Sequence, residues 1–174
     1  MRYHLLLSQS AMDEQPVRAS GRAPVTAEQF VQFAFRSSEG GYLYMLGLDN
    51  TGDWFVMPLS FTDAVAKITP GAEAVVPSLP YISLNSPSGT ENFTVIFSDK
   101  PLSLPFASET LPLDGSFRKL TAEELRQIED LRRQAAPATI QFEGEKENET
   151  GVIKLAGERG SKPVLFDITL KLQR

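Results

Sequence analysis

Four aromatic side chains are the residues of this chain best suited to bind a ligand. Tyr42 and Tyr44 are two positions apart in a segment with the pattern of a β-strand, so they share one face of it. Trp54 lies in the segment expected to pair with that strand, and Tyr81 lies in a later one. Rings exposed together on a sheet bind sugars or peptides, whereas the same spacing in cross-strand packing fills a core. The pattern therefore predicts a binding surface if the rings share an exposed face.

Acidic residues at two turns offer oxygen ligands for a cation. Asp49, Asn50 and Asp53 are close in sequence, but the alternating acids and closing glutamate of an EF-hand loop are absent. The segment 49–52 (DNTG) is typical of a tight hairpin turn instead. A second group alternates along a segment that a lysine interrupts, which favours a solvated loop. It consists of Glu143, Glu145, Glu147 and Glu149. We therefore predict no metal site.

No constellation of residues specifies a reaction. His4 is the only histidine, so a Ser-His-Asp triad would depend on one residue in a first strand that we expect at a sheet edge. The chain has no cysteine, which excludes disulfides, thiolate chemistry and thiolate metal ligands. Glu91 and Asp99 flank one expected strand at its opposite ends, so a hydrolase with a carboxylate pair is the lowest-ranked alternative. We predict neither catalytic residues nor a cofactor.

Composition bounds the class of protein. The chain has 174 residues, of which 41% are hydrophobic and 11 are phenylalanine, and this is enough for one domain with a real core. The formal net charge is −5 and no run of Lys or Arg occurs, which argues against nucleic acid as a partner. No segment approaches the roughly 20 apolar residues of a membrane-spanning helix. We expect residues 1–174 to form a single domain, as a module of a larger protein.

Most of the expected elements are short strands. Val31, Phe33 and Phe35 alternate with neighbours that are mostly polar, as in a strand with one buried face. Residues 42–48 are apolar on both faces, as in a central strand. Glycine-containing turns at 38–41 and 49–52 are expected to join three successive strands within residues 30–59. Further strand candidates are residues 3–8, 72–76, 80–84, 92–98, 139–143, 151–156 and 164–172, and residues 60–68 are expected to form a short helical turn.

One helix is predicted over residues 121–136. Thr121 and Glu124 have the spacing of a capping box. Leu125, Ile128 and Leu131 then follow at helical spacing, and Pro137 ends the helix. A single helix among about nine strands indicates an antiparallel β-sandwich, with a partly open barrel as the alternative.

A series of short motifs runs through residues 26–102. They are the segments 41–44 (GYLY), 49–52 (DNTG), 57–58 (MP), 88–91 (SGTE) and 95–101 (VIFSDKP), together with Gly71 and Pro77. Taken together they resemble a bacterial family, the domain of unknown function 4384, with Met57 standing where that family usually has Phe. The resemblance implies an accessory module of bacterial multidomain proteins, and it brings no catalytic residue with it.

These observations predict a non-catalytic accessory module that binds a protein partner or other domains of its parent chain. The alternative is a sandwich that binds a carbohydrate or another envelope polymer through exposed tyrosine and tryptophan rings. An unpaired sheet edge, which we expect at residues 3–8, favours binding by strand addition. The sandwich architecture and the absence of cysteine favour the periplasm or cell envelope while leaving the compartment open.

Overall fold

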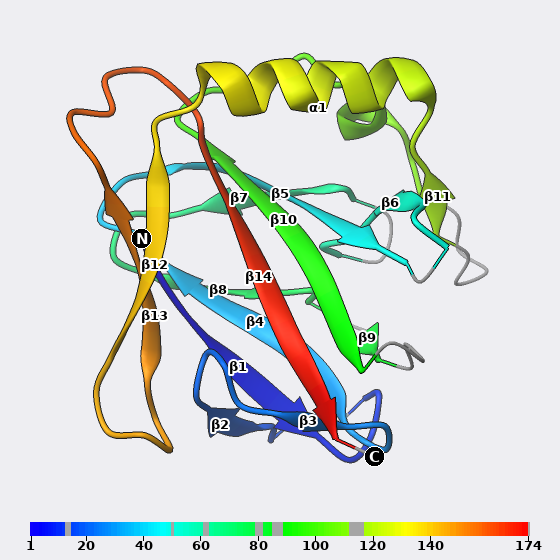
Figure 1. Cartoon of the computed structure of the whole chain (residues 1–174), viewed down its shortest axis with the longest axis vertical. Helices are drawn as coiled ribbons and strands as arrows, with labels where there is room; N and C mark the ends of the chain where they lie inside the picture. The colour runs from blue at the N-terminus through cyan, green and yellow to red at the C-terminus, as the bar shows by residue number, and fades with distance from the viewer. Residues whose placement is uncertain are drawn as a thin grey trace.

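The computed structural model describes residues 1–12, 15–49, 51–60, 63–78, 82–84, 89–111 and 117–173. Two β-sheets pack face to face, and an α-helix lies across the outside of one of them (Figure 1). The predicted antiparallel β-sandwich with one helix is therefore confirmed for the described residues. These contain fourteen strands, rather than about nine, because short pairing segments occur where the sequence pattern is irregular.

The first sheet has the strand order β12-β13-β1-β4-β8, with β2 beside β1 and β9 beside β4. Its ladders are all antiparallel. Its strands are β1 (Arg2–Ser8), β2 (Val17–Ala19), β4 (Phe30–Arg36), β8 (Glu73–Val76), β9 (Ile82–Ser83), β12 (Ala138–Glu143) and β13 (Thr150–Leu155).

The second sheet has the order β11-β6-β5-β10-β14-β3, with β7 beside β5. Its strands are β3 (Val25–Thr26), β5 (Gly41–Leu48), β6 (Trp54–Val56), β7 (Val65–Ile68), β10 (Thr90–Ser98), β11 (Arg118–Lys119) and β14 (Val164–Gln173). The β14–β3 pair is parallel and the other ladders are antiparallel. Because β5 pairs with β10 on one side and with β6 and β7 on the other, the predicted central position of residues 42–48 is confirmed.

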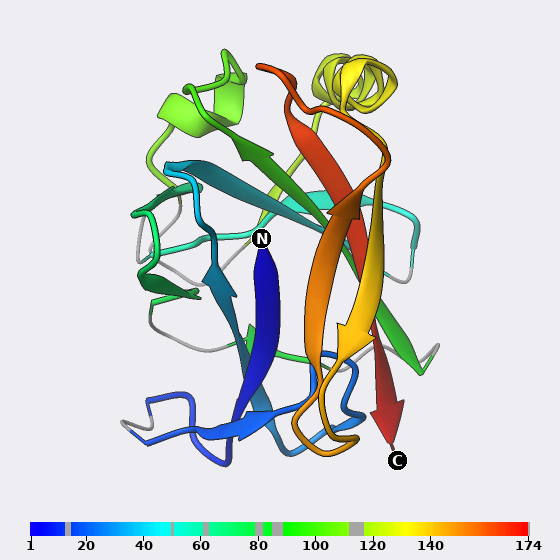
Figure 2. The same ribbon diagram turned by 90° about the vertical axis from the view of Figure 1, so that its left-hand side faces the viewer.

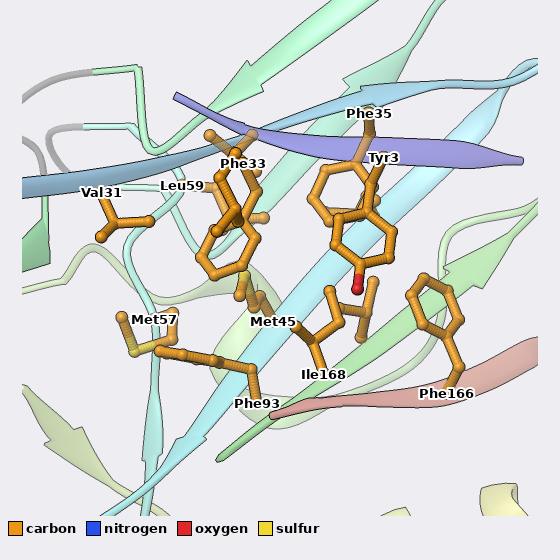
Figure 3. Close-up of a cluster of buried hydrophobic side chains, with 14 of the residues drawn as sticks. Tyr3, Val31, Phe33, Phe35, Met45, Met57, Leu59, Phe93, Phe166 and Ile168 are labelled. Atoms are coloured by element: carbon orange, nitrogen blue, oxygen red, sulfur yellow. The ribbon is translucent and has the colours of Figure 1, made fainter. Parts of the chain in front are cut away.

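The main core lies between the two sheets. Phe33 on β4 meets Phe93 on β10 edge to face, with ring centroids 5.2 Å apart, and this contact joins the sheets. Val31, Phe33 and Phe35 all point inward and are fully buried, as their alternation predicts (Figure 3). Side chains from both sheets interdigitate around them; they include Tyr3, Met45, Met57, Leu59, Phe166 and Ile168.

A second core lies on the outer face of the second sheet. The helix α1 (Ala122–Gln134) and the 3-10 helix Pro105–Ser108 cover the side chains of β5, β10 and β14 there. Ile128 is buried, and the predicted capping box is present: the Glu124 N–H donates to the Thr121 hydroxyl and the Thr121 N–H donates to the Glu124 carboxylate. The fold is thus a two-sheet sandwich with a third, partial layer.

Two bidentate ion pairs join the helix of this third layer to strands of the second sheet. Arg132 on α1 donates to both carboxylate oxygens of Asp167 on β14, at 2.8 Å each, and to the hydroxyl of Thr94 on β10. Arg118 donates to both oxygens of the buried Glu124 in the same way. Burial raises the pKa of Glu124, but the hydrogen bonds from Arg118 and Thr121 lower it by more, so the carboxylate stays charged.

Three local expectations are corrected. The segment 38–41 makes no hairpin within a sheet, because β4 and β5 belong to different sheets and the chain crosses between them. Residues 3–8 are not at a sheet edge, since β1 pairs with β4 along its length and with β13 and β2 on its other side. Residues 60–68 contain the strand β7 where a helical turn is expected. By contrast β5 and β6 pair as the predicted antiparallel hairpin, and in the described part of the turn Gly52 has φ 88°.

Gly41 is required for a reason other than a tight reversal. Its φ is not positive, and positive values among the described residues occur only at other glycines. A Cβ at this position would collide with the Ser98 carbonyl oxygen and would lie 2.9 Å from the Phe97 ring. The glycine therefore allows β5 to enter the sheet directly against β10.

Among the described residues no helix has both the length and the apolar character needed to cross a membrane.

We expect Gly41→Ala to lower the free energy of unfolding by about 1–3 kcal/mol, because the added methyl overpacks a site closed by backbone. Gly157→Ala is the matched control: its φ is not positive and nothing lies within 4 Å of the place its methyl would take, so the change is within about 0.5 kcal/mol. Urea denaturation measures both. Equal stabilities of the two variants would contradict this explanation of Gly41.

Candidate functional site

The predicted aromatic surface does not form a single exposed platform. Tyr44 exposes only 1% of its surface, because the third layer covers it, and its hydroxyl accepts a hydrogen bond from the Leu102 N–H at 2.8 Å. Tyr42 and Trp54 are half-buried against the same outer core. Tyr81 lies outside the described residues.

Tyr42 and Trp54 are also far apart. Trp54 pairs with Leu48, which is six residues along β5 from Tyr42, so their backbone positions are about 20 Å apart along the strand. The carbohydrate interpretation requires rings that are exposed together, and the structure does not bring these three together in that way.

His4 lies inside the first sheet rather than at its edge. It is 6% exposed, and its Nε2 is 4.0 Å from a carboxylate oxygen of Glu73. Burial and the charge of Arg18 lower the pKa of His4, and the charge of Glu73 opposes this shift only in part. The imidazole is therefore neutral at pH 7 and occupies a packed position in the sheet.

The acidic groups singled out in the sequence are held by partners within the described residues. Asp49 Oδ1 accepts from the backbone N–H groups of Thr51 and Asp53 at 2.9 and 2.8 Å, as in an Asx turn. Asp53 forms an ion pair with Lys119 at 2.5 Å. Asn50 lies outside the described residues. These contacts stabilise the hairpin turn that the sequence predicts.

The alternating glutamates of the hairpin 143–149 separate into two groups. Glu143 pairs with Lys154 at 2.8 Å, and Glu149 receives a bidentate contact from Arg22 at 2.7 and 2.8 Å. Glu145 and Glu147 are exposed at the tip between β12 and β13. The tip therefore carries two exposed carboxylates with the exposed Lys146 between them, which leaves it a net negative charge.

Glu91 and Asp99 are too far apart to act as a catalytic pair. Glu91 is in β10 and Asp99 directly follows that strand, eight residues further along. The extended chain between them spans about 27 Å, whereas the two carboxylates of a glycosidase are about 5–10 Å apart.

The structure instead presents an unpaired strand edge at β12. β12 pairs with β13 on one side, where the Pro137 carbonyl accepts from the Ala156 N–H at 3.0 Å. Because backbone groups alternate in direction along a strand, Thr139, Gln141 and Glu143 also face β13. The N–H and C=O groups of the alternate residues point the other way; these are Ala138, Ile140 and Phe142. Among the described residues these groups have no hydrogen-bond partner.

The edge of β14 that points away from β10 lies opposite this edge of β12. The Leu172 N–H donates to the Gly89 carbonyl on the β10 side, so the backbone groups of Leu165, Asp167 and Thr169 point away from β10. β12 and β14 start side by side near α1, joined by the Ala136–Val164 bridge, and then diverge (Figures 1 and 2). We call the region between Ala138–Phe142 and Leu165–Thr169 the β12–β14 seam. β3, which pairs with the end of β14, bounds it at the other end.

The two edges of the seam differ in burial. The inward side chains of β14, Phe166 and Ile168, are 4% and 1% exposed. Those of β12, Ala138, Ile140 and Phe142, are only half-buried although they pack against the main core. A strand added along β12 would therefore satisfy backbone groups and cover apolar side chains at once.

No family model, curated protein or solved structure matches this chain. The resemblance of residues 26–102 to the domain of unknown function 4384 family therefore stays a prediction.

No local sequence signal identifies the seam. Pro137 stands just before β12 and has no N–H, but its backbone groups face β13, so it carries no information on the outer edge. Periodicity predicts the hairpin of β12 and β13, but it carries no information on which strand lacks a second neighbour.

We expect Tyr44→Phe to lower the free energy of unfolding by about 1 kcal/mol, because the Leu102 N–H loses its acceptor. Tyr42→Phe, at a half-buried hydroxyl on the same strand face, changes it by less than about 0.5 kcal/mol. Chemical denaturation compares the two. A larger loss of unfolding free energy for Tyr42→Phe than for Tyr44→Phe would contradict the burial of the Tyr44 hydroxyl beneath the outer layer.

We expect amide hydrogen exchange to alternate along β12. The amides of Ala138, Ile140 and Phe142 exchange at least about tenfold faster than those of Thr139 and Gln141, which are bonded to β13. NMR-detected exchange resolves each residue. Uniform protection along β12 would mean that another segment already occupies its outer edge.

Proposed function

We propose that this chain is a non-catalytic binding module that recognises an extended segment of a protein partner by adding it as a strand along β12. The observation that carries the proposal is the row of unpaired backbone groups at Ala138, Ile140 and Phe142, which have no partner among the described residues. Main-chain hydrogen bonds supply affinity in this mode of recognition, and side-chain pockets supply specificity.

The apolar side chains of β12 and the charge of the neighbouring hairpin tip define the sequence expected of the partner segment. Residues on one face of the added strand would lie over Ile140 and Phe142, so alternate positions are apolar. One end of that strand would lie beside the acidic tip, where Glu145 and Glu147 are exposed. That end therefore carries lysine or arginine, since complementary charge fixes the register and speeds association.

The source of the segment is a separate protein or another domain of the parent chain. The resemblance of residues 26–102 supports an accessory role in a bacterial multidomain protein, and the sandwich architecture with no cysteine supports a place at the cell envelope. The accessory role and the place at the cell envelope are both part of the proposal.

A displayed library of random ten-residue peptides tests the proposal, with the whole 174-residue chain as bait. We expect enriched peptides to alternate apolar and polar residues and to carry a basic residue near one end. Ile140→Pro weakens their binding at least about tenfold, because proline removes an outward N–H and leaves the β13 ladder intact.

Ile140→Val is the matched control. It shortens the side chain by one carbon and keeps the N–H, so the dissociation constant of a selected peptide changes by less than about threefold. Unfolding curves of both variants confirm that each is folded. The proposal fails if no peptide is enriched, or if Ile140→Pro and the parent protein retain the same peptides with equal affinity.

A further inference from the structure

A second feature lies on the outer face of the first sheet, on the far side of β13 from the seam. A hollow of about 400 Å³ opens there, lined by Met1, Arg2, Arg36, Ser37, Ser38 and Gly71. No carboxylate lines it among the described residues. In a chain of net charge −5, this is a local concentration of positive charge.

The two arginines are brought together by strand register. Arg2 on β1 is the direct cross-strand partner of Arg36 on β4. Side chains in this position start from Cβ atoms about 5 Å apart, and like charges directly opposite one another repel. An anion between the two guanidinium groups replaces that repulsion with two attractive, hydrogen-bonded contacts.

Each guanidinium group has a contact that orients it, and each keeps N–H donors that are not used in a hydrogen bond within the described residues. Arg36 Nε donates to the Gly71 carbonyl at 2.7 Å, and its terminal nitrogens have no partner among the described residues. Arg2 has a single ionic contact, 3.6 Å from a carboxylate oxygen of Glu143, and no hydrogen bond in the same part of the chain. Several N–H donors are thus available around the hollow.

Among the described residues three carboxylates neighbour the hollow, and each also contacts a group outside it. Glu39, next to Ser38, bonds to Arg159 at 2.5 Å. Glu143 bonds to Lys154 at 2.8 Å, closer than it approaches Arg2. Glu73, the cross-strand partner of Arg36, is 4.0 Å from His4. Glu143 and Glu73 offset part of the positive charge at the rim, but neither lines the hollow itself.

Ser38 adds neutral donors at the rim. It is exposed, and among the described residues neither its hydroxyl nor its backbone N–H has a hydrogen-bond partner. Ser37 is buried, and its hydroxyl accepts from the Glu39 N–H at 3.1 Å, which holds the turn in place. The Gly71 N–H donates to the Ser37 carbonyl at 2.7 Å, so a second segment supports the same turn.

We propose that the Arg2–Arg36 hollow binds an oxyanion, either a phosphate group or a carboxylate. The guanidinium N–H groups of Arg2 and Arg36 donate to its charged oxygens, and the Ser38 hydroxyl donates to a further oxygen. This site is separate from the β12–β14 seam and does not depend on strand addition.

Titration with inorganic phosphate tests the proposal, with acetate as a second arm and with sodium chloride keeping the ionic strength constant. Two-dimensional ¹H–¹⁵N spectra report the Ser38 and Gly71 amides and the Arg36 Nε–H. We expect saturable shifts of these signals with at least one of the two anions, and the arm that saturates at lower concentration identifies the source of the charge.

Arg2→Gln is the main variant, because the Arg2 side chain makes no hydrogen bond within the described residues and its loss leaves the fold intact. It weakens binding at least about tenfold. Arg126→Gln, which removes an exposed arginine paired with Glu123 on α1, leaves binding unchanged. Shifts that never saturate with either anion, or that are the same in Arg2→Gln and Arg126→Gln, would overturn the proposal.

Discussion

A β-strand has two hydrogen-bonding edges, and the way in which these edges are satisfied organises this molecule. β10 is paired on both sides, with β5 and β14, and β1 is paired with β4 on one side and with β13 and β2 on the other. One corner of the sandwich is closed by covalent continuity, since β7 of the second sheet leads through a short turn into β8 of the first. At the opposite corner the Ala136–Val164 bridge joins the sheets at a single point. Several short strands, among them β7 and β8, also pair on one side only; along the β12–β14 seam two longer strands leave backbone groups unpaired.

The remaining features follow from packing these paired sheets. The contact of Phe33 with Phe93 joins their inner faces, while α1 and the segment before it cover part of one outer face. Ion pairs help to hold this outer layer in place, as in the pair of Arg132 with Asp167. In the described part of the chain the first sheet has no such layer, and both surfaces that we propose for binding lie on it: one along its β12 edge and one on its outer face.

Local patterns in the sequence predict local structure well. The alternation through Phe33 and Phe35 predicts the buried face of β4, and the capping residues Thr121 and Glu124 predict the start of α1. What the sequence does not indicate is which strands are neighbours, because side-chain alternation sets the face of a strand and not its partner. For this reason the edge position predicted for residues 3–8 is wrong, and β1 is inside the sheet.

The candidate sites likewise depend on tertiary neighbours that local sequence patterns do not indicate. Strand periodicity alone allows Tyr44 to be exposed, but residues 102–111 fold over it, and that segment has no periodic signal. The β12–β14 seam depends on which strands lie beside β12, and the Arg2–Arg36 pair depends on the register between two strands that are distant in sequence, so neither follows from a motif.

The central claim is that β12 accepts a strand, and isotope-edited NMR of the chain with a selected peptide tests it most directly. Strand addition predicts backbone-to-backbone nuclear Overhauser effects between the peptide and Ala138, Ile140 and Phe142, in the regular ladder of paired strands. Contacts confined to side chains elsewhere, such as Tyr42 or Trp54, with no backbone contact along β12, would contradict it.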